Sequence, residues 1–240
     1  MKKIFSLIVC SFLITSLFAQ KEINDANAEI RKVGSFTSLS ISNAFDVIIT
    51  QGTEEGLAVS ASDKEDMQYI KTEVSGGTLK IWFDNNDKKF WPKNRKLRAY
   101  VSVKQLEEIK ASGATEINIE GGLSGTNLKL NFSGASDLEG KINLTGVLYI
   151  NASGASDLTL TGSANEISID ASGASDVKAI GFTVNSCRNI EGSGASSISI
   201  SVTNDIAEAK LSGASSLVYK GNPSIKNIKT SGASSISRKS

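Results

Sequence analysis

Ser-Gly-Ala-Thr at residues 112–115 opens a series of near-identical tetrapeptides that decides the fold of this chain. Six later copies read Ser-Gly-Ala-Ser and begin at Ser133, Ser153, Ser172, Ser193, Ser212 and Ser231. Successive copies of this SGAS tetrapeptide are 21, 20, 19, 21, 19 and 19 residues apart. A nearly fixed period is typical of a solenoid, in which each repeat packs only against its neighbours.

Apolar residues flank every tetrapeptide at fixed distances. Three positions before its first Ser stand Ile109, Leu130, Ile150, Ile169, Ile190, Ala209 and Ile228. Five positions after that Ser stand Ile117, Leu138, Leu158, Val177, Ile198, Leu217 and Ile236. Apolar side chains at every second residue indicate β-strands with one buried face. The same alternation passes through Gly134 and Ser136, so we expect a nearly continuous strand that bends at the glycine.

The repeat length and pattern exclude the common helical solenoids. A repeat of two helices needs about 33 residues or more, and the Leu spacing of a leucine-rich repeat is absent. The sequence therefore predicts an all-β fold, a parallel β-helix of about 20-residue coils, right-handed by the general crossover preference. Equivalent residues of successive coils then stack about 4.8 Å apart, the spacing of paired strands.

Composition changes along the chain predict four segments. Residues 1–19 read as a signal peptide, with Lys2 and Lys3 before an apolar run and a cleavage site after Ala19. The apolar run is too short to span a bilayer, so we expect no transmembrane segment in the mature chain. A lipidated start at Cys10 fits less well because the residue before it is not small. Residues 20–33 form a polar tether, residues 34–104 a β-rich N-terminal cap that continues into the solenoid, and residues 105–240 the seven-repeat β-helix.

Both ends of a β-helix leave strand edges unpaired, and such edges recruit other strands unless they are covered. The cap is expected to cover the first edge and to contain one short helix, opened by Ser62 with Glu65 three residues later. After the seventh tetrapeptide only six residues remain. Arg238 and Lys239 are expected to protect this second edge, and a homodimer through it is the alternative.

The charge and the rare residues limit the possible functions. The net charge is +1 and the chain has no His, which removes the commonest general base and metal ligand. Together with the signal peptide, this balance indicates that nucleic acid is not a partner. Once residues 1–19 are removed, Cys187 is the sole thiol. It lies in an apolar stretch, which favours a core position over a reactive one.

An acidic column is expected one residue after the tetrapeptide, on the outer surface. It consists of Glu116, Asp137, Asp157 and Asp176, followed by Ser in the last three coils. The simplest interpretation is a solvated turn face, and a Ca²⁺ site is the alternative because Ca²⁺ takes oxygen ligands. No other cofactor is indicated. A glycoside hydrolase needs two carboxyl groups in unlike environments, which a regular ladder does not offer.

A basic and aromatic segment at residues 84–98 is the best candidate binding site in the sequence. It holds six basic residues and two adjacent aromatic residues between two predicted strands, and its length exceeds that of an ordinary hairpin loop. We expect it either to bind an anionic glycan, a lipid headgroup or an envelope protein, or to fold back on the cap. The candidate residues are Lys88, Lys89, Phe90, Trp91, Lys93 and Arg95.

Three motifs together resemble a known family. They are Phe-Asp-Val-Ile-Ile-Thr-Gln-Gly at residues 45–52, Gly-Thr-Leu-Lys-Ile at residues 77–81 and the series of SGAS tetrapeptides. The chain from about residue 34 to residue 237 resembles the autotransporter-adhesin head domain, often called the head GIN domain. The resemblance implies a secreted β-helical protein of Gram-negative bacteria, often Bacteroidetes, without established enzymatic activity. We expect the protein to depart from a full autotransporter, with no translocating barrel after the repeats.

These observations together predict a non-enzymatic, adhesin-like module of the cell envelope. It would be exported to the periplasm or the outer cell surface and would present a β-helix surface to a glycan or an envelope protein. The alternative is a polysaccharide-active β-helix enzyme, either a hydrolase or a lyase.

Overall fold

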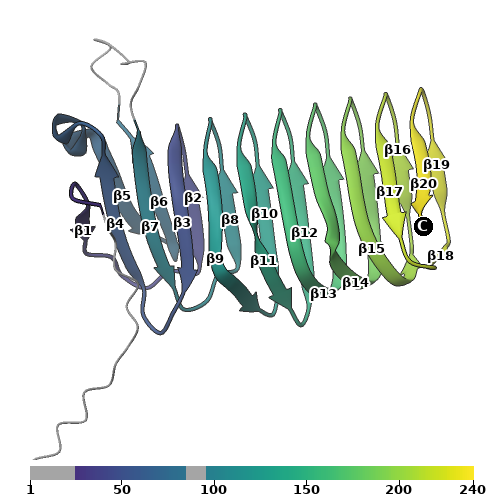
Figure 1. The fold of residues 1–240 in the computed structure, drawn as a ribbon, viewed down its shortest axis with the longest axis horizontal. Helices are drawn as coiled ribbons and strands as arrows, with labels where there is room; N and C mark the ends of the chain where they lie inside the picture. The colour runs from purple at the N-terminus through teal and green to yellow at the C-terminus, as the bar shows by residue number, and fades with distance from the viewer. Residues whose placement is uncertain (1–24, 85–95) are drawn as a thin grey trace, which may run out of the picture.

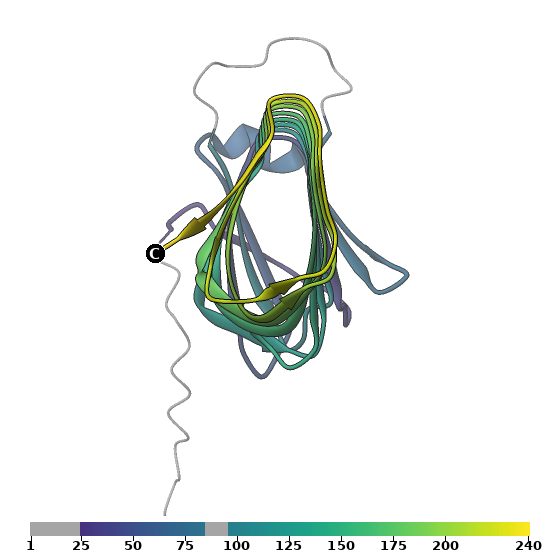
Figure 2. The same cartoon turned by 90° about the vertical axis from the view of Figure 1, so that its right-hand side faces the viewer.

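The computed structural model describes residues 25–84 and 96–240, and these residues form a parallel β-helix (Figure 1). In cross-section each coil is narrow at one end and wide at the other (Figure 2). We call the narrow end the tip and the wide end the base. The strands that run toward the tip form face A, and those that run away from it form face B. Seen from the C-terminal end, the chain circles counterclockwise as it approaches the viewer, so the helix is right-handed (Figure 2).

Each coil has one strand on each face. Face A contains β2 (Ser38–Ile41), β6 (Thr78–Phe83), β8 (Glu108–Ala111), β10 (Leu128–Phe132), β12 (Val147–Ala152), β16 (Ala209–Leu211) and β19 (Ile228–Thr230). Face B contains β3 (Phe45–Gln51), β7 (Leu97–Val103), β9 (Glu116–Gly125), β11 (Asp137–Leu144), β15 (Ser197–Ile206), β17 (Ser216–Lys220) and β20 (Ser235–Lys239). The long strands β13 (Asp157–Ala171) and β14 (Asp176–Gly192) pass from face B to face A, and β18 (Ser224–Ile225) lies at the base of the last coil.

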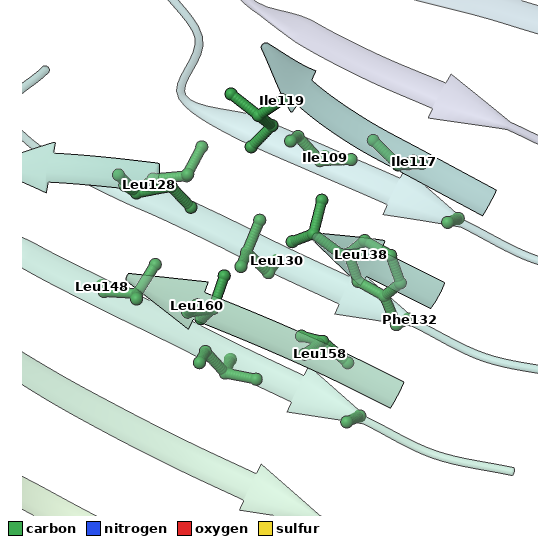
Figure 3. Packing of buried hydrophobic residues seen from close by; sticks show 14 of the residues in the cluster. Ile109, Ile117, Ile119, Leu128, Leu130, Phe132, Leu138, Leu148, Leu158 and Leu160 are labelled. Carbon is green, nitrogen blue, oxygen red and sulfur yellow. The ribbon is translucent and has the colours of Figure 1, made fainter. Parts of the chain in front are cut away.

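The core is built from the two apolar columns expected from the sequence. On face A, Ile109 is in register with Leu130, and the column continues through Ile150 to Ile228. On face B the column from Ile117 to Ile236 is also in register. Side chains from the two faces point toward one another and fill the interior (Figure 3). The predicted all-β solenoid is therefore confirmed.

The SGAS tetrapeptide is a tight turn at the tip and not the nearly continuous strand expected from its alternation. Strand β10 ends at Phe132 and β11 begins at Asp137. Gly134 lies between them with a φ of 77°, in the left-handed region that glycine adopts without strain. Gly134 is exposed where the alternation predicted a buried residue. The chain reverses direction here, so the strands before and after the turn belong to opposite faces.

Stacking of these turns leaves no room for a side chain at the glycine. The backbone N–H of Ala135 donates to the carbonyl oxygen of Gly113 in the preceding coil at 2.7 Å, and the same bond recurs from Ala155 to Gly134. A Cβ added at Gly134 would lie 2.4 Å from the Gly113 oxygen. The glycine is therefore required both for its φ and for the close approach of successive coils.

The last residue of each of the first six tetrapeptides is a buried residue with a hydroxyl group. The side chain of Ser136 is fully buried, and its Oγ donates to the carbonyl oxygen of Ser133 at 2.8 Å. Ser175 makes the same bond to Ser172 at 2.8 Å. Most buried hydroxyl groups in proteins are hydrogen-bonded, and the turn supplies an acceptor three residues back. Ser196 differs, because its buried Oγ has no partner among the described residues.

The N-terminal part adds two further rungs in an order that the sequence did not reveal. Strands β2 and β3 pair with β8 and β9 on one side and with β6 and β7 on the other. The turn between β2 and β3 takes the place of an SGAS turn. Here Asn43 replaces the glycine with a φ of 79°, and its carbonyl oxygen accepts from the N–H of Ala114 at 3.0 Å. Asn adopts this conformation more readily than most other residues do.

Antiparallel strands cover the N-terminal end. Strand β4 (Gly56–Ala61) pairs with β7, β5 (Ile70–Ser75) pairs with β6, and β1 (Glu29–Arg31) pairs with β4. The short helix of this region is the 3₁₀-helix η1 (Lys64–Tyr69). Its N-cap is Asp63, whose side chain accepts from the N–H of Glu65, so the expectation of Ser62 as the cap was wrong.

A polar cluster attaches the start of the described chain to this cap. The side chain of Asp25 is 12% exposed and accepts hydrogen bonds from Ser60 Oγ at 2.7 Å and Tyr100 Oη at 3.0 Å. The bond from Ser60, the N–H of Asn27, the hydroxyl of Tyr100 and the charge of Arg98 hold the pKa of Asp25 below its usual value, although burial opposes them. Asp25 is therefore a fixed negative group at this end of the solenoid.

Replacing a tip glycine should destabilise the stack sharply. A Cβ at Gly173 would lie 2.5 Å from the Gly154 carbonyl oxygen, and the φ of Gly173 is 72°. We expect Gly173→Ala to lower the free energy of unfolding by about 2–4 kcal/mol, measured by urea denaturation. Gly34→Ala is the matched control, because no atom lies within 4 Å of its Cβ position. Equal stabilities of the two variants would contradict the role assigned to the turn.

The two kinds of buried tetrapeptide serine should respond differently to loss of the hydroxyl. Ser175→Ala removes the bond to the Ser172 carbonyl and should cost about 1 kcal/mol. Ser196→Ala removes a buried hydroxyl without a partner among the described residues, so stability should stay the same or rise. Thermal and urea unfolding of the two variants, measured together, tests this difference. A larger loss for Ser196→Ala than for Ser175→Ala would refute it.

Candidate functional site

An open groove lies on face A, next to the tip. Its volume is about 500 Å³, and it extends over five successive rungs from β2 to the end of β13. Two polar columns that run parallel to the helix axis line it. The inner column is Ser112, Ser133, Ser153 and Ser172, the first residues of four tetrapeptides. The outer column is Ser40, Lys110, Asn131, Asn151 and Asp170, two residues before the turn in each coil.

The strand register places the amide groups of the outer column within hydrogen-bond distance of one another. Asn151 Nδ2 donates to Asn131 Oδ1 at 2.8 Å, and Asn131 Nδ2 donates to Glu108 Oε1 at 2.9 Å. Lys110 forms an ion pair with Glu108 at 2.8 Å. The middle of the groove is therefore uncharged and offers both donors and acceptors, repeated at the strand spacing of about 4.8 Å.

An exposed aromatic side chain stands beside the groove on the same face. Tyr149 lies two residues before Asn151 on β12 and is 37% exposed. Arg188 Nη1 lies 3.3 Å from Tyr149 Oη, and Arg188 also pairs with Glu166. These contacts restrain the tyrosine with part of its ring open to solvent. Such a ring offers a flat apolar platform with a polar end.

The acidic column expected from the sequence lies on face B with its four members in register. The strand register adds a fifth carboxylate to the column. Asp46 lies next to Glu116 of the following rung and next to Arg98 of the preceding rung. Lys178 forms ion pairs with both Asp157 and Asp176, and its hydrogen bond with Asp157 is the main cause of its raised pKa.

Arg98 and Lys178 place positive charge next to the carboxylates of the acidic column. No group of three metal-ligating side chains occurs in the part of the chain that the structure describes. Calcium binding by Glu116, Asp137, Asp157 and Asp176 therefore stays a prediction. The ammonium group of Lys178 would compete with Ca²⁺ for the carboxylates of Asp157 and Asp176.

The candidate loop residues Lys88, Lys89, Phe90, Trp91, Lys93 and Arg95 all lie outside the described residues. The flanking strands do show where the segment is attached. Strand β6 ends at Phe83 and β7 begins at Leu97, so the segment joins the two faces of the rung nearest the N-terminal cap. In the SGAS coils a four-residue turn makes this connection. Binding by the loop stays a prediction.

The thiol of Cys187 occupies the core position expected for it. Its side chain is fully buried, and burial raises its pKa to about 12, so it is protonated at neutral pH. No helix in residues 25–84 or 96–240 is both long enough and apolar enough to cross a membrane.

Comparison with protein families identifies the fold's relatives. The model of the family described as "Putative auto-transporter adhesin, head GIN domain" matches residues 35–223, which is most of the chain. The protein belongs to the head GIN domain family. This confirms the resemblance drawn from residues 45–52, 77–81 and the SGAS tetrapeptides. Comparison with curated proteins found no match.

Solved structures with the same fold come from Bacteroides and Parabacteroides. A "putative adhesin" from Bacteroides fragilis is 25% identical, with a TM-score of 0.78 over 88% of this chain and 96% of that chain. A "putative lipid binding protein" from Parabacteroides distasonis is 21% identical, with a TM-score of 0.62 over 90% and 98% of the two chains. A "putative adhesin" from Parabacteroides merdae is 18% identical, with a TM-score of 0.63 over 89% and 96%. At the family level, the head GIN domain is an adhesin-like, non-enzymatic binding module.

Calcium should affect the acidic column most when Lys178 is absent. Lys178→Met leaves Asp157 and Asp176 adjacent without their shared counter-charge, and exposed pairs of this kind contribute about 0–1 kcal/mol. We expect millimolar Ca²⁺ to raise the melting temperature of Lys178→Met more than that of the wild type. The added substitution Asp157→Asn should abolish the rise. Identical melting curves in chelator and in Ca²⁺ for all three proteins would dismiss the calcium site.

Proposed function

We propose that this protein is exported to the cell envelope of a Gram-negative bacterium, where it binds a neutral glycan along the face A groove. The observation that carries the proposal is the uncharged ladder of Ser hydroxyl and Asn amide groups over successive rungs. An envelope protein is the alternative partner for the same face. The signal-peptide features of residues 1–19 and the membership in an adhesin-like family support export.

The chemistry of the groove favours a hydroxyl-rich, linear ligand. Each rung offers a hydroxyl and, in the central coils, an amide, which together donate and accept hydrogen bonds with sugar hydroxyl groups. Tyr149 adds an exposed ring face for the apolar side of a sugar ring. A polymer with a short repeat can make the same contacts in successive coils, so weak single contacts add up along the groove.

No specific observation favours the alternative of a polysaccharide-active enzyme. The carboxylates on face B lie in one ladder and share basic partners, whereas acid–base catalysis needs two groups in unlike environments. The loop residues Phe90, Trp91 and Lys93 remain a second proposed contact region, suited to an anionic group on a glycan or a lipid.

Substitutions in the groove should weaken glycan binding without unfolding the protein. We expect Asn131→Ala with Asn151→Ala, and separately Tyr149→Ala, to weaken binding of a neutral glycan to the mature chain at least about tenfold. The glycan is first selected on a glycan array, and affinity is then measured by titration calorimetry. Asn118→Ala is the control, because Asn118 is exposed like Asn151 but lies on face B.

Three outcomes of this experiment would redirect the proposal. A loss confined to Trp91→Ala with Lys93→Ala would move the site from the groove to the loop. If the same face captured an envelope protein but no glycan, the proposed ligand would be that protein. Release of new reducing ends from a bound polysaccharide would restore the enzyme interpretation. Fractionation of cells that express the tagged chain tests export, and recovery in the cytoplasm would contradict it.

A further inference from the structure

The C-terminal end of the β-helix has an open edge. Strand β19 pairs only with β16, and β20 only with β17, so the outer side of each lacks a partner strand within the described residues. The apolar columns are uncovered at this end. Ile228 is 50% exposed, whereas Ala209 at the equivalent position one coil earlier is buried. Ile225 and Ile236 are only partly buried.

This end is also strongly basic. Residues 216–240 contain five basic residues and no acidic one. They are Lys220, Lys226, Lys229, Arg238 and Lys239. Lys226 and Lys229 reach back to Asp205 and Glu208 of the preceding coil. In the described chain no ion pair engages Lys220, Arg238 or Lys239, so their charges remain available to a partner.

The strands and the 3₁₀-helix that cover the N-terminal end, β4, η1 and β5, carry the opposite charge, whereas residues 88–98, which follow β6 in the sequence, are basic. Residues 54–75, which include β4, η1 and β5, contain six acidic residues and two basic ones. Glu65 and Glu73 are exposed on this surface. The end also has free strand edges, because β5 pairs only with β6 and β1 only with β4 in the described residues. Ile30 on β1 is 84% exposed.

We propose that the basic C-terminal end of one copy docks on the acidic N-terminal end of the next, and that the β-helices thereby join head to tail. The strand directions allow pairing on both faces. On face A, β5 runs opposite to β19, so these strands would pair antiparallel. On face B, β1 runs in the same direction as β20, so these strands would pair in parallel. Ile228 and Ile236 of one copy and Ile30 of the other are then removed from water.

Charge decides between this arrangement and a symmetric dimer. Two C-terminal ends in contact would bring two sets of five basic residues together, and such like-charge contacts are disfavoured. Two different surfaces in contact form a heterologous interface, which produces open chains unless the rotation closes a ring. The homodimer that the sequence offered as an alternative would thus be replaced by a longer head-to-tail assembly.

Charge reversal at either end, followed by mixing, tests the proposal on the mature chain, residues 20–240. Wild-type mass, measured by light scattering and sedimentation, should rise with concentration without a plateau at the dimer. Association should weaken at least about tenfold in about 0.5 M salt, where charges are strongly screened. Arg238→Glu with Lys239→Glu should stay monomeric, and so should Glu65→Lys with Glu73→Lys. An equimolar mixture of these two variants should associate again, because their charges are complementary.

Lys129→Glu with Lys141→Glu is the matched control for Arg238→Glu with Lys239→Glu, since it makes the same change in net charge on two exposed residues away from the ends. It should associate like the wild type, and circular dichroism should show that all variants remain folded. A wild type that stays monomeric at all concentrations would overturn the proposal. Association of the Glu65→Lys with Glu73→Lys variant by itself, or a plateau at the dimer, would instead indicate contact between two C-terminal ends.

Discussion

The close contact between successive turns at the tip constrains the whole structure. From coil to coil, the alanine N–H of one tetrapeptide meets the glycine carbonyl of the tetrapeptide before it at 2.7–2.8 Å, and no side chain fits between them. The register is therefore fixed at the tip. The repeats nevertheless vary in length, and the irregularities lie elsewhere. The pairing shifts at Gly140/Ile142, Ala179/Thr183 and Val184/Ser186, away from the turns. Further shifts occur at Thr159/Thr161 and Ile167/Ser168. Length changes are therefore absorbed between one tip turn and the next, and the tip turns stay in register.

The sequence predicted the fold because its strongest signal and its tightest constraint are the same residues. The columns that begin at Ile109 and Ile117 could be read directly from their distance to the tetrapeptide, and the register agrees with them. The turn itself was misread because alternation alone does not distinguish a bent strand from a reversal. The φ of Gly134 settles that question, and a sequence does not display it. The same limit hid Asn43, which performs the role of the glycine without repeating the motif.

The candidate site was harder to predict because it depends on which columns are neighbours. Asn131 and Asn151 stand at the same distance before their tetrapeptides, so the sequence contained the signal for a polar ladder. Whether this ladder forms part of a binding groove depends on the adjacent serine column and on Tyr149. It therefore depends on the turn that places these residues on face A. The charged features give a stronger signal in the sequence alone. The acidic column proved to be partly neutralised by Lys178 and Arg98, whose positions follow from pairing across coils.

A β-helix of this kind satisfies its backbone and its core by stacking, so its sides and its ends differ in chemistry. Along the sides each strand has two partners, and recognition is left to outward side chains whose spacing the coils impose. Such a surface suits the binding of a repetitive ligand better than catalysis by one distinct side chain, because successive coils offer similar environments.

At the ends the same stacking leaves strand edges and apolar columns without a next coil. Natural sheets often prevent pairing there with charged residues. In this protein the charges at the two ends differ in sign, with an acidic surface around Glu65 and Glu73 and a basic one around Arg238 and Lys239. Charge of one sign at both ends would keep copies apart in every orientation. Opposite signs oppose contact between like ends and favour contact between unlike ends, so the same residues that protect each edge also select its partner.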